Sequence, residues 1–169
     1  ESGPTSALLA AQGSDGIDLR RPPRRQPGGR ERSGDERGRH DAPMMGRRLA
    51  QRHVKPDLIL SSPAVRALAT AQLVAEQIGC DPSHIVIDER LYASSVGSLL
   101  DVIRALDDKL ERVMVFGHNP EFTGLAHRLS PQITDMPTCA VAEFNFDIVA
   151  WRDVGEAKPT KVSLDTPKT

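Results

Sequence analysis

The chain has 169 residues, 38% of them hydrophobic, and a formal net charge of −1. This length suits one domain with its own core, and the balanced charge argues against a nucleic-acid binder. The two cysteines, Cys80 and Cys139, lack CxxC spacing and do not suggest a disulfide scaffold. No apolar stretch approaches the ~20 residues of a membrane span, and the apolar run at 6–11 is too short for a secretory signal. We therefore expect a cytoplasmic protein that contacts neither nucleic acid nor membrane.

Residues 1–39 differ in composition from the rest of the chain. They are rich in arginine and glycine and contain no lysine, histidine or aromatic residue. The stretch 20–39 shows no apolar periodicity, so it cannot bury enough surface to offset the entropy of ordering. We expect an atypical, disordered segment here. A nucleic-acid-binding arm is the alternative, but acidic residues alternate with the arginines.

From residue 40 onward, strand-like and helical patterns alternate. The patterns predict helices at 41–51, 63–78, 96–106 and 120–129, and strands at 57–61, 85–87, 113–116 and 140–146, with a further short strand at 149–151. This alternation predicts an α/β fold in three layers, a mostly parallel sheet flanked by helices. We divide the chain into the atypical segment 1–39, a domain at 40–153 and a polar tail at 154–169 that adds one further strand at most.

One strand–helix junction occurs twice. Residues 57–66 read Asp-Leu-Ile-Leu-Ser-Ser-Pro-Ala-Val-Arg, and residues 113–120 read Val-Met-Val-Phe-Gly-His-Asn-Pro. In each, an apolar strand leads to a capping residue, Ser62 or Asn119, then to a proline suited to the first position of a helix. In parallel α/β folds ligands bind at the carboxyl ends of strands, and helix N-termini attract anions. The doubled junction therefore predicts an anion site.

Arg66 and His118 make a phosphoryl group the favoured anion. Arg66 is placed to reach back over the start of its helix, and a guanidinium can bind two phosphate oxygens at once. His118, at the tip of the second strand, can donate to an oxygen when protonated or act as a base or nucleophile when neutral. We predict that Arg66, His118, Ser62 and Asn119 bind phosphate. Each residue alone also has a structural interpretation, such as an exposed helical arginine or a hydrogen-bonding histidine.

These motifs resemble those of a known family. Residues 61–71, Ser-Ser-Pro-Ala-Val-Arg-Ala-Leu-Ala-Thr-Ala, resemble the S-S-P-x-x-R-A-x-x-T-A segment of the histidine phosphatase superfamily, and Gly-His-Asn-Pro at 117–120 resembles its second-histidine motif. The small size and the segments at 91–93 and 136–141 resemble its SixA-like phosphohistidine phosphatase branch. The resemblance covers roughly 36–152 and implies the phosphoglycerate mutase-like fold.

The resemblance also implies a mechanism. In the family, a histidine that ends the first strand attacks phosphorus and becomes phosphorylated, and water then releases phosphate. Arg66 and His118 would be the catalytic residues of this chain that stabilise charge on the phosphoryl oxygens. The resemblance implies no metal and no cofactor. It also implies a monomer that takes part in signal transduction, with a phosphohistidine-bearing protein or a small phosphate ester as its partner.

The nucleophile of that mechanism is not identifiable in this chain. The family's Arg-His motif should follow an apolar strand near the N-terminus, yet His40 and His53, which do follow arginines, have no such strand before them. We therefore expect the first strand to be absent or altered, its neighbours to lack pairing partners, and activity to be impaired. A shifted reading frame is one explanation, since synonymous codons allow residues 5–12 to read as an apolar strand ending in Arg-His. Sequencing the coding DNA would decide it.

Three functions remain open at this stage. The leading one is a SixA-like phosphohistidine phosphatase impaired by the missing nucleophile. The second is an inactive pseudoenzyme of the same fold that binds phosphate or a phosphoprotein, which phosphate binding without a phosphoenzyme would distinguish. The third is a phosphatase of small phosphorylated metabolites, although this chain has little room for the insertions that cap the site in such relatives.

Overall fold

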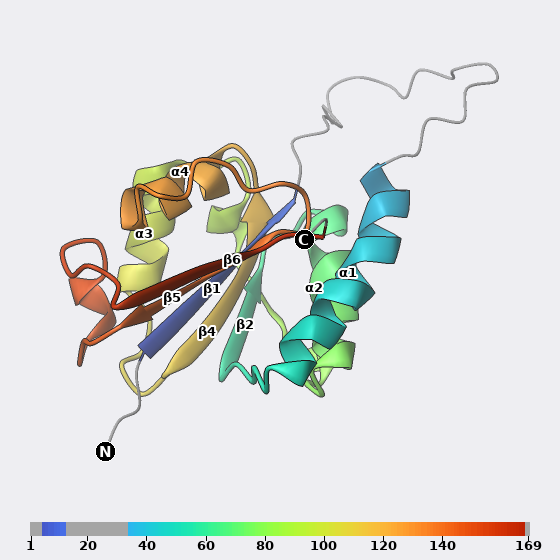
Figure 1. Ribbon diagram of the computed structural model, residues 1–169, viewed down its shortest axis with the longest axis horizontal. Helices are drawn as coiled ribbons and strands as arrows, with labels where there is room; N and C mark the ends of the chain where they lie inside the picture. Colours follow the sequence, from blue (N-terminus) through green and yellow to red (C-terminus); the bar gives the residue numbers. More distant parts are fainter. Residues whose placement is uncertain (1–4, 13–33, 168–169) are drawn as a thin grey trace.

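The strands form a mostly parallel sheet, as predicted. The computed structural model describes residues 5–12 and 34–167, and within them one six-stranded sheet has the order β3-β2-β4-β1-β5-β6 (Figure 1). Strands β1, β2, β3 and β4 run parallel to one another, whereas β5 and β6 are antiparallel to their neighbours. The strands span Thr5–Gln12 (β1), Leu58–Ser61 (β2), Val86–Ile87 (β3), Arg112–His118 (β4), Val141–Phe146 (β5) and Lys161–Asp165 (β6).

Helices cover both faces of the sheet and complete the three layers. The α-helices span Gly34–Gln51 (α1), Val65–Gln77 (α2), Val96–Arg104 (α3) and Glu121–Leu129 (α4), and short 3-10 helices span Pro82–His84 (η1), Glu89–Leu91 (η2) and Trp151–Asp153 (η3). Helices α1 and α2 lie on one face, and α3 and α4 on the other (Figure 1). Within the described residues, no helix is both long and apolar enough to cross a membrane.

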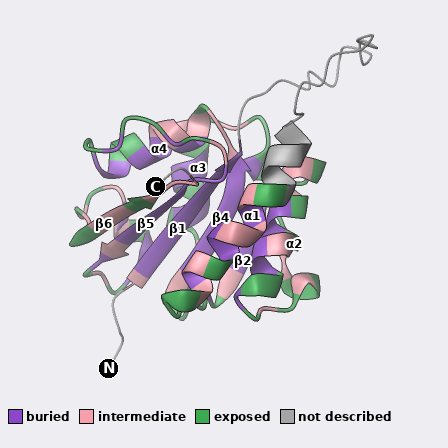
Figure 2. Ribbon diagram, turned by 45° about the vertical axis from the view of Figure 1, so that its right-hand side comes forward, coloured by how far each residue is buried: buried purple, intermediate pink, exposed green. Residues whose placement is uncertain are grey.

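The central strand β1 lies inside the segment that we expected to be disordered. Its residues from Ser6 to Gln12 are buried, and Figure 2 shows it between two buried neighbours. Leu8 packs in the apolar cluster beneath α1 and α2, and Leu9 in the cluster beneath α3 and α4. Burying each leucine stabilises the fold by roughly 1.5–3 kcal/mol. The expectations that Thr5–Gln12 lack regular structure and that neighbouring strands lack pairing partners are therefore wrong.

Other boundaries also differ from the expected ones. Helix α1 begins at Gly34 rather than at residue 41, and α2 begins at Val65 rather than at residue 63. The strand expected at 149–151 does not form, because the chain turns there into η3. The tail contributes β6, which pairs with β5. Residues 13–33 lie outside the described part, and the division of the chain at residues 39 and 153 stays a prediction.

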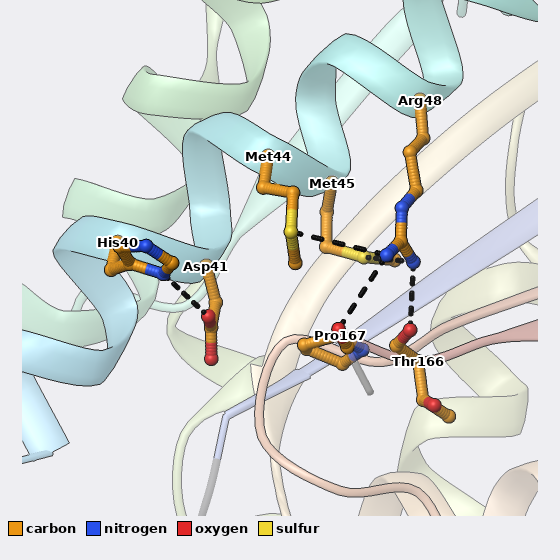
Figure 3. A network of polar contacts seen from close by, with 7 residues as sticks. All are labelled: His40, Asp41, Met44, Met45, Arg48, Thr166 and Pro167. Carbon is orange, nitrogen blue, oxygen red and sulfur yellow. Dashed lines mark hydrogen bonds and ion pairs between the residues drawn. The ribbon is translucent and has the colours of Figure 1, made fainter. Parts of the chain in front are cut away.

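The C-terminal tail is held against α1 by Arg48. Its Nη1 donates to Oδ1 of Asp165 at 2.8 Å and to the carbonyl oxygen of Thr166 at 2.7 Å. The same guanidinium lies over the sulfur atoms of Met44 and Met45 (Figure 3). An arginine that combines a carboxylate with a backbone carbonyl is fixed in orientation. The edge strand β6 is thus tied to the helical layer as well as to β5.

Gly117 permits the close approach of α4 to the end of β4. A Cβ atom at this position would lie 2.3 Å from two ring atoms of Phe122, which is fully buried. The ring belongs to the core, so it has no open space into which it could move. The glycine before His118 therefore has a packing role.

We expect Gly117→Ala to lower the free energy of unfolding by about 1–3 kcal/mol, the usual effect of overpacking. The control is Gly97→Ala in α3, where the nearest atom to a new Cβ is 4.0 Å away. That substitution should leave stability unchanged or raise it by up to about 1 kcal/mol, because alanine favours a helix. Urea unfolding measures both. A Gly117→Ala protein as stable as the parent would refute the packing role.

Candidate functional site

The carboxyl ends of β1, β2 and β4 meet at one edge of the sheet. Gln12, the last residue of β1, pairs in register with His118, the last residue of β4. On the other side of β4, Ser61 pairs with Phe116, and the backbone nitrogen of Ser62 donates to the Phe116 carbonyl oxygen at 3.0 Å. The ends of three strands thus bring residues 12, 62 and 118 together, as expected for a parallel sheet.

His118 and Ser62 are in direct contact at this edge. The Nε2 atom of His118 lies 2.8 Å from Oγ of Ser62, whose side chain is fully buried. The same Oγ accepts a hydrogen bond from the backbone nitrogen of Ala64 at 3.2 Å. The contact fixes the orientation of the imidazole and ties the end of β4 to the segment that leads into α2.

Three effects set the pKa of His118. Partial burial lowers it most, because desolvation disfavours the imidazolium, and the positive charge of Arg66 lowers it further. The carboxylate of Glu121 acts in the opposite direction. The result is a pKa below the ordinary value of 6.5, so the imidazole is neutral at pH 7.

Arg66 lies in the first turn of α2, near enough to His118 for its charge to act on the imidazole. The structure therefore brings the two predicted catalytic residues into one site. The prediction that Ser62 caps the helix is wrong, since α2 begins at Val65 with Ala64 as the N-cap residue. Ser62 lies before the helix, and the extended backbone at Ala64 separates it from the first turn.

Asn119 has structural contacts on every polar atom of its side chain. Oδ1 accepts from the backbone nitrogen of Thr123 at 3.1 Å and from its hydroxyl at 2.8 Å, and Nδ2 donates to the carbonyl oxygen of Met136. The amide therefore holds the start of α4, which begins at Glu121 after Pro120. Phosphate binding by Asn119 stays a prediction, and these contacts favour a positioning role.

Sequence reasoning missed three residues that border His118. Glu121 supplies the carboxylate described above. Tyr92 packs edge-to-face against the imidazole, with ring centroids 5.8 Å apart, and its ring is partly exposed at the rim. Gln12 is 4% exposed, and its Nε2 has no hydrogen-bond partner in the described part of the chain. The signal for Gln12 was available, because the short apolar run at 6–11 ends there.

None of the other four histidines contacts Ser62 or Arg66 within the described residues. His40 is exposed on α1 beside Asp41 (Figure 3), and His53 is exposed after the same helix. His84 is exposed in η1, and His127 contacts the carbonyl oxygen of Ile133 through Nδ1 at 2.9 Å. Among the described residues, no group of His, Cys, Asp and Glu side chains could hold a metal ion.

Cys139 lies beside Gln12 but is not a reactive thiol. Burial raises its pKa to about 11, the charge of Asp41 also raises it, and the Gln12 side chain lowers it somewhat. The sulfur is therefore protonated at neutral pH, and a thiol is a poor nucleophile compared with a thiolate. Both cysteines are free, with Cys139 buried and Cys80 partly buried.

The model of the histidine phosphatase superfamily (branch 1) matches residues 28–119. The chain belongs to this superfamily. Its matched region contains the first junction and the second as far as Asn119, the residue after His118. None of the curated proteins matches the chain.

Solved structures of histidine phosphatases share the fold over nearly the whole chain. The putative phosphohistidine phosphatase SixA from Nakamurella multipartitia is 16% identical, with a TM-score of 0.70 and coverage of 99% of each chain. The protein histidine phosphatase SixA complexed with tungstate is 19% identical, with a TM-score of 0.70 and coverage of 97% of this chain and 98% of that one. A mycobacterial glucosyl-3-phosphoglycerate phosphatase complexed with VO3 is 16% identical, with a TM-score of 0.57 and coverage of 96% and 97%. The family and these neighbours are phosphatases.

The lowered pKa of His118 links stability to pH. The unfolded chain binds a proton at this residue near pH 6.5, whereas the folded chain binds it only at lower pH. The contribution of His118 to the free energy of unfolding is therefore present above about pH 6.5, and it is lost as the pH falls toward the pKa of His118 in the folded protein. We expect His118→Gln to reduce the fall in unfolding free energy between about pH 7.5 and about pH 5. Urea unfolding at both values measures this, and an NMR titration giving His118 a pKa at or above 6.5 would contradict it.

Proposed function

We propose that the edge formed by His118, Arg66 and Ser62 is a phosphoryl-binding site of the SixA-like type, and that turnover there is impaired. The observation that carries the proposal is a half-buried imidazole at the ends of two parallel strands that contacts Ser62 directly and lies near enough to Arg66 to be affected by its charge. A phosphoryl group is a tetrahedral anion, and a guanidinium beside hydrogen-bonding side chains complements its charge and its oxygens.

Charge favours a bound anion at this site. Arg66 depresses the pKa of His118 because two positive charges would repel each other there. A phosphate dianion placed between them removes that repulsion and attracts the protonated form of the imidazole. His118 then becomes a donor to the anion, as the family's mechanism requires of its second histidine.

Impaired turnover follows from the end of β1. In the family's mechanism the nucleophile is a histidine that ends the first strand, and here that strand ends in Ala11 and Gln12. Neither a methyl group nor an amide forms a phosphoenzyme at neutral pH. Within the described residues, the end of β1 thus offers no group that would attack phosphorus, while the residues that would hold the oxygens remain.

The favoured ligand is a phosphohistidine on another protein. The support is the likeness to SixA structures along nearly the whole chain. Small phosphate esters are the second candidate, supported by the likeness to the mycobacterial glucosyl-3-phosphoglycerate phosphatase. We keep signal transduction, a cytoplasmic location and a monomeric state as parts of the proposal.

Arg66→Ala should weaken the binding of inorganic phosphate at least about tenfold, because hydrogen bonds to charged groups contribute about 1.5–3 kcal/mol each. The phosphate affinity of Arg66→Lys should lie between those of the parent and Arg66→Ala, since a lysine keeps the charge but not the planar pair of donors. Isothermal titration calorimetry measures the affinities. The control is Arg128→Ala, an exposed arginine in the last turn of α4. Equal phosphate affinity in the Arg66→Ala and Arg128→Ala proteins would refute the proposed site.

The purified protein should release phosphate from a 32P-labelled phosphohistidine protein no faster than its His118→Gln variant does. It should also form no acid-labile phosphoenzyme, because no nucleophile ends β1. Release of labelled phosphate and mass spectrometry of the chain measure the two outcomes. Turnover by the parent protein that is lost on His118→Gln would contradict impairment, and a phosphoryl group found on His118 by mass spectrometry would identify it as the attacking group.

A further inference from the structure

Gln12 presents a buried donor that has no acceptor. Its side chain is 4% exposed, and Nε2 has no hydrogen-bond partner in the described residues. Buried amide groups in folded proteins almost always find a partner. The Gln12 side chain is close enough to Cys139 to lower the pKa of the thiol somewhat, but the thiol is protonated, sulfur is a weak acceptor, and Nε2 makes no hydrogen bond to it of normal geometry. An unpartnered amide at this depth indicates that a group is missing from the site.

The position of Gln12 indicates what kind of group its amide could bind. It is the register partner of His118 on the adjacent parallel strand, and residues paired in this way point to the same face of the sheet. Leu8 and Ala10, four and two residues earlier on β1, pack beneath α1 and α2, so alternation places Gln12 on that face too. Arg66 in α2 is near enough for its charge to act on the same imidazole. The amide therefore lies beside a histidine that is under the influence of an arginine, a setting that suits an acceptor group carrying negative charge.

We propose that Nε2 of Gln12 donates a hydrogen bond to an oxygen of the bound phosphoryl group and so acts as a ligand-binding residue at the strand end where the family places its nucleophile. This inference rests on the proposed function, since it names a further donor for the same site. The amide does not ionise near neutral pH, so its contribution does not change the pKa of His118. The role is non-covalent, because the amide nitrogen forms no bond to phosphorus.

A purely structural role for Gln12 makes a different prediction. If the amide only filled space, leucine at this position would leave phosphate binding unchanged. If the amide binds a ligand, leucine has two effects. Without phosphate it removes an unsatisfied donor from the protein, and in the phosphate complex it removes a donor to the bound anion. The two roles therefore differ in how the substitution acts with and without phosphate.

The experiment compares Gln12→Leu and Gln12→Glu with the parent protein, using inorganic phosphate as the probe. Calorimetry gives the dissociation constants, and thermal unfolding is followed with and without saturating phosphate. The matched controls are Gln51→Leu and Gln51→Glu, at an exposed glutamine that ends α1. We expect Gln12→Leu to weaken phosphate binding about tenfold, and Gln12→Glu to weaken it further because a carboxylate repels the anion.

Without phosphate, Gln12→Leu should unfold at the same temperature as the parent or higher. The rise in its unfolding temperature on adding phosphate should be smaller than that of the parent. Undiminished phosphate affinity in both Gln12 variants, together with the loss expected for Arg66→Ala, would overturn this inference and leave the proposed function standing. Absence of phosphate binding by the parent protein itself would overturn both. Equal losses of phosphate affinity in the Gln12 and Gln51 variants would also overturn the inference, because the effect would then not be specific to the position of Gln12.

Discussion

The in-register parallel pairing of β1 with β4 is the constraint on which the rest of the structure depends. It runs from Ser6 opposite Arg112 to Gln12 opposite His118, and it places β1 at the centre of the sheet. A strand in this position is buried on both faces, which requires a continuous apolar run rather than an alternating one. Residues 7–11, Ala-Leu-Leu-Ala-Ala, meet that requirement without any aromatic or β-branched residue. A shift of one residue in this pairing would separate Gln12 from His118.

The junction after β4 is fixed by packing rather than by the ligand. Gly117 leaves room for the ring of Phe122, and Asn119 binds the first turn of α4 and the loop at Met136. These contacts leave the His118 imidazole as the polar side chain of the motif directed at Ser62. The Gly-His-Asn-Pro motif therefore combines one residue that faces Ser62 with neighbours that orient it, which is how a rigid scaffold holds a functional group in place.

The sequence predicted the fold class, because the alternation of strands and helices can be read locally along the chain. It also placed Arg66 and His118 at one site, because the carboxyl ends of parallel strands lie at the same edge of the sheet. It failed at β1, where low β-propensity and the composition of residues 1–39 concealed a strand that exists through burial on both faces. It also misplaced the start of α2, since the serine that bonds to Ala64 does so from outside the helix. Tyr92 and Gln12 come from segments distant in sequence from His118, and their proximity to it emerges only when the sheet has formed. Glu121 lies only three residues after His118, and it was missed because it reads as an ordinary acidic residue in the first turn of a helix.

The electrostatics of the site favour a ligand that carries charge and is held without covalent bonds. His118 is neutral because burial and Arg66 both disfavour its proton, so among the described residues the site combines a guanidinium, a neutral imidazole and an amide with the carboxylate of Glu121 nearby. A phosphoryl dianion changes that balance, since its charge stabilises the imidazolium and its oxygens accept from the guanidinium and the amide together. With a histidine at the end of β1, the same donors would stabilise a phosphoryl group in transfer. With Gln12 there, the proposed site keeps donors for the anion but has an amide in place of the attacking imidazole, so we expect the anion to be bound rather than cleaved.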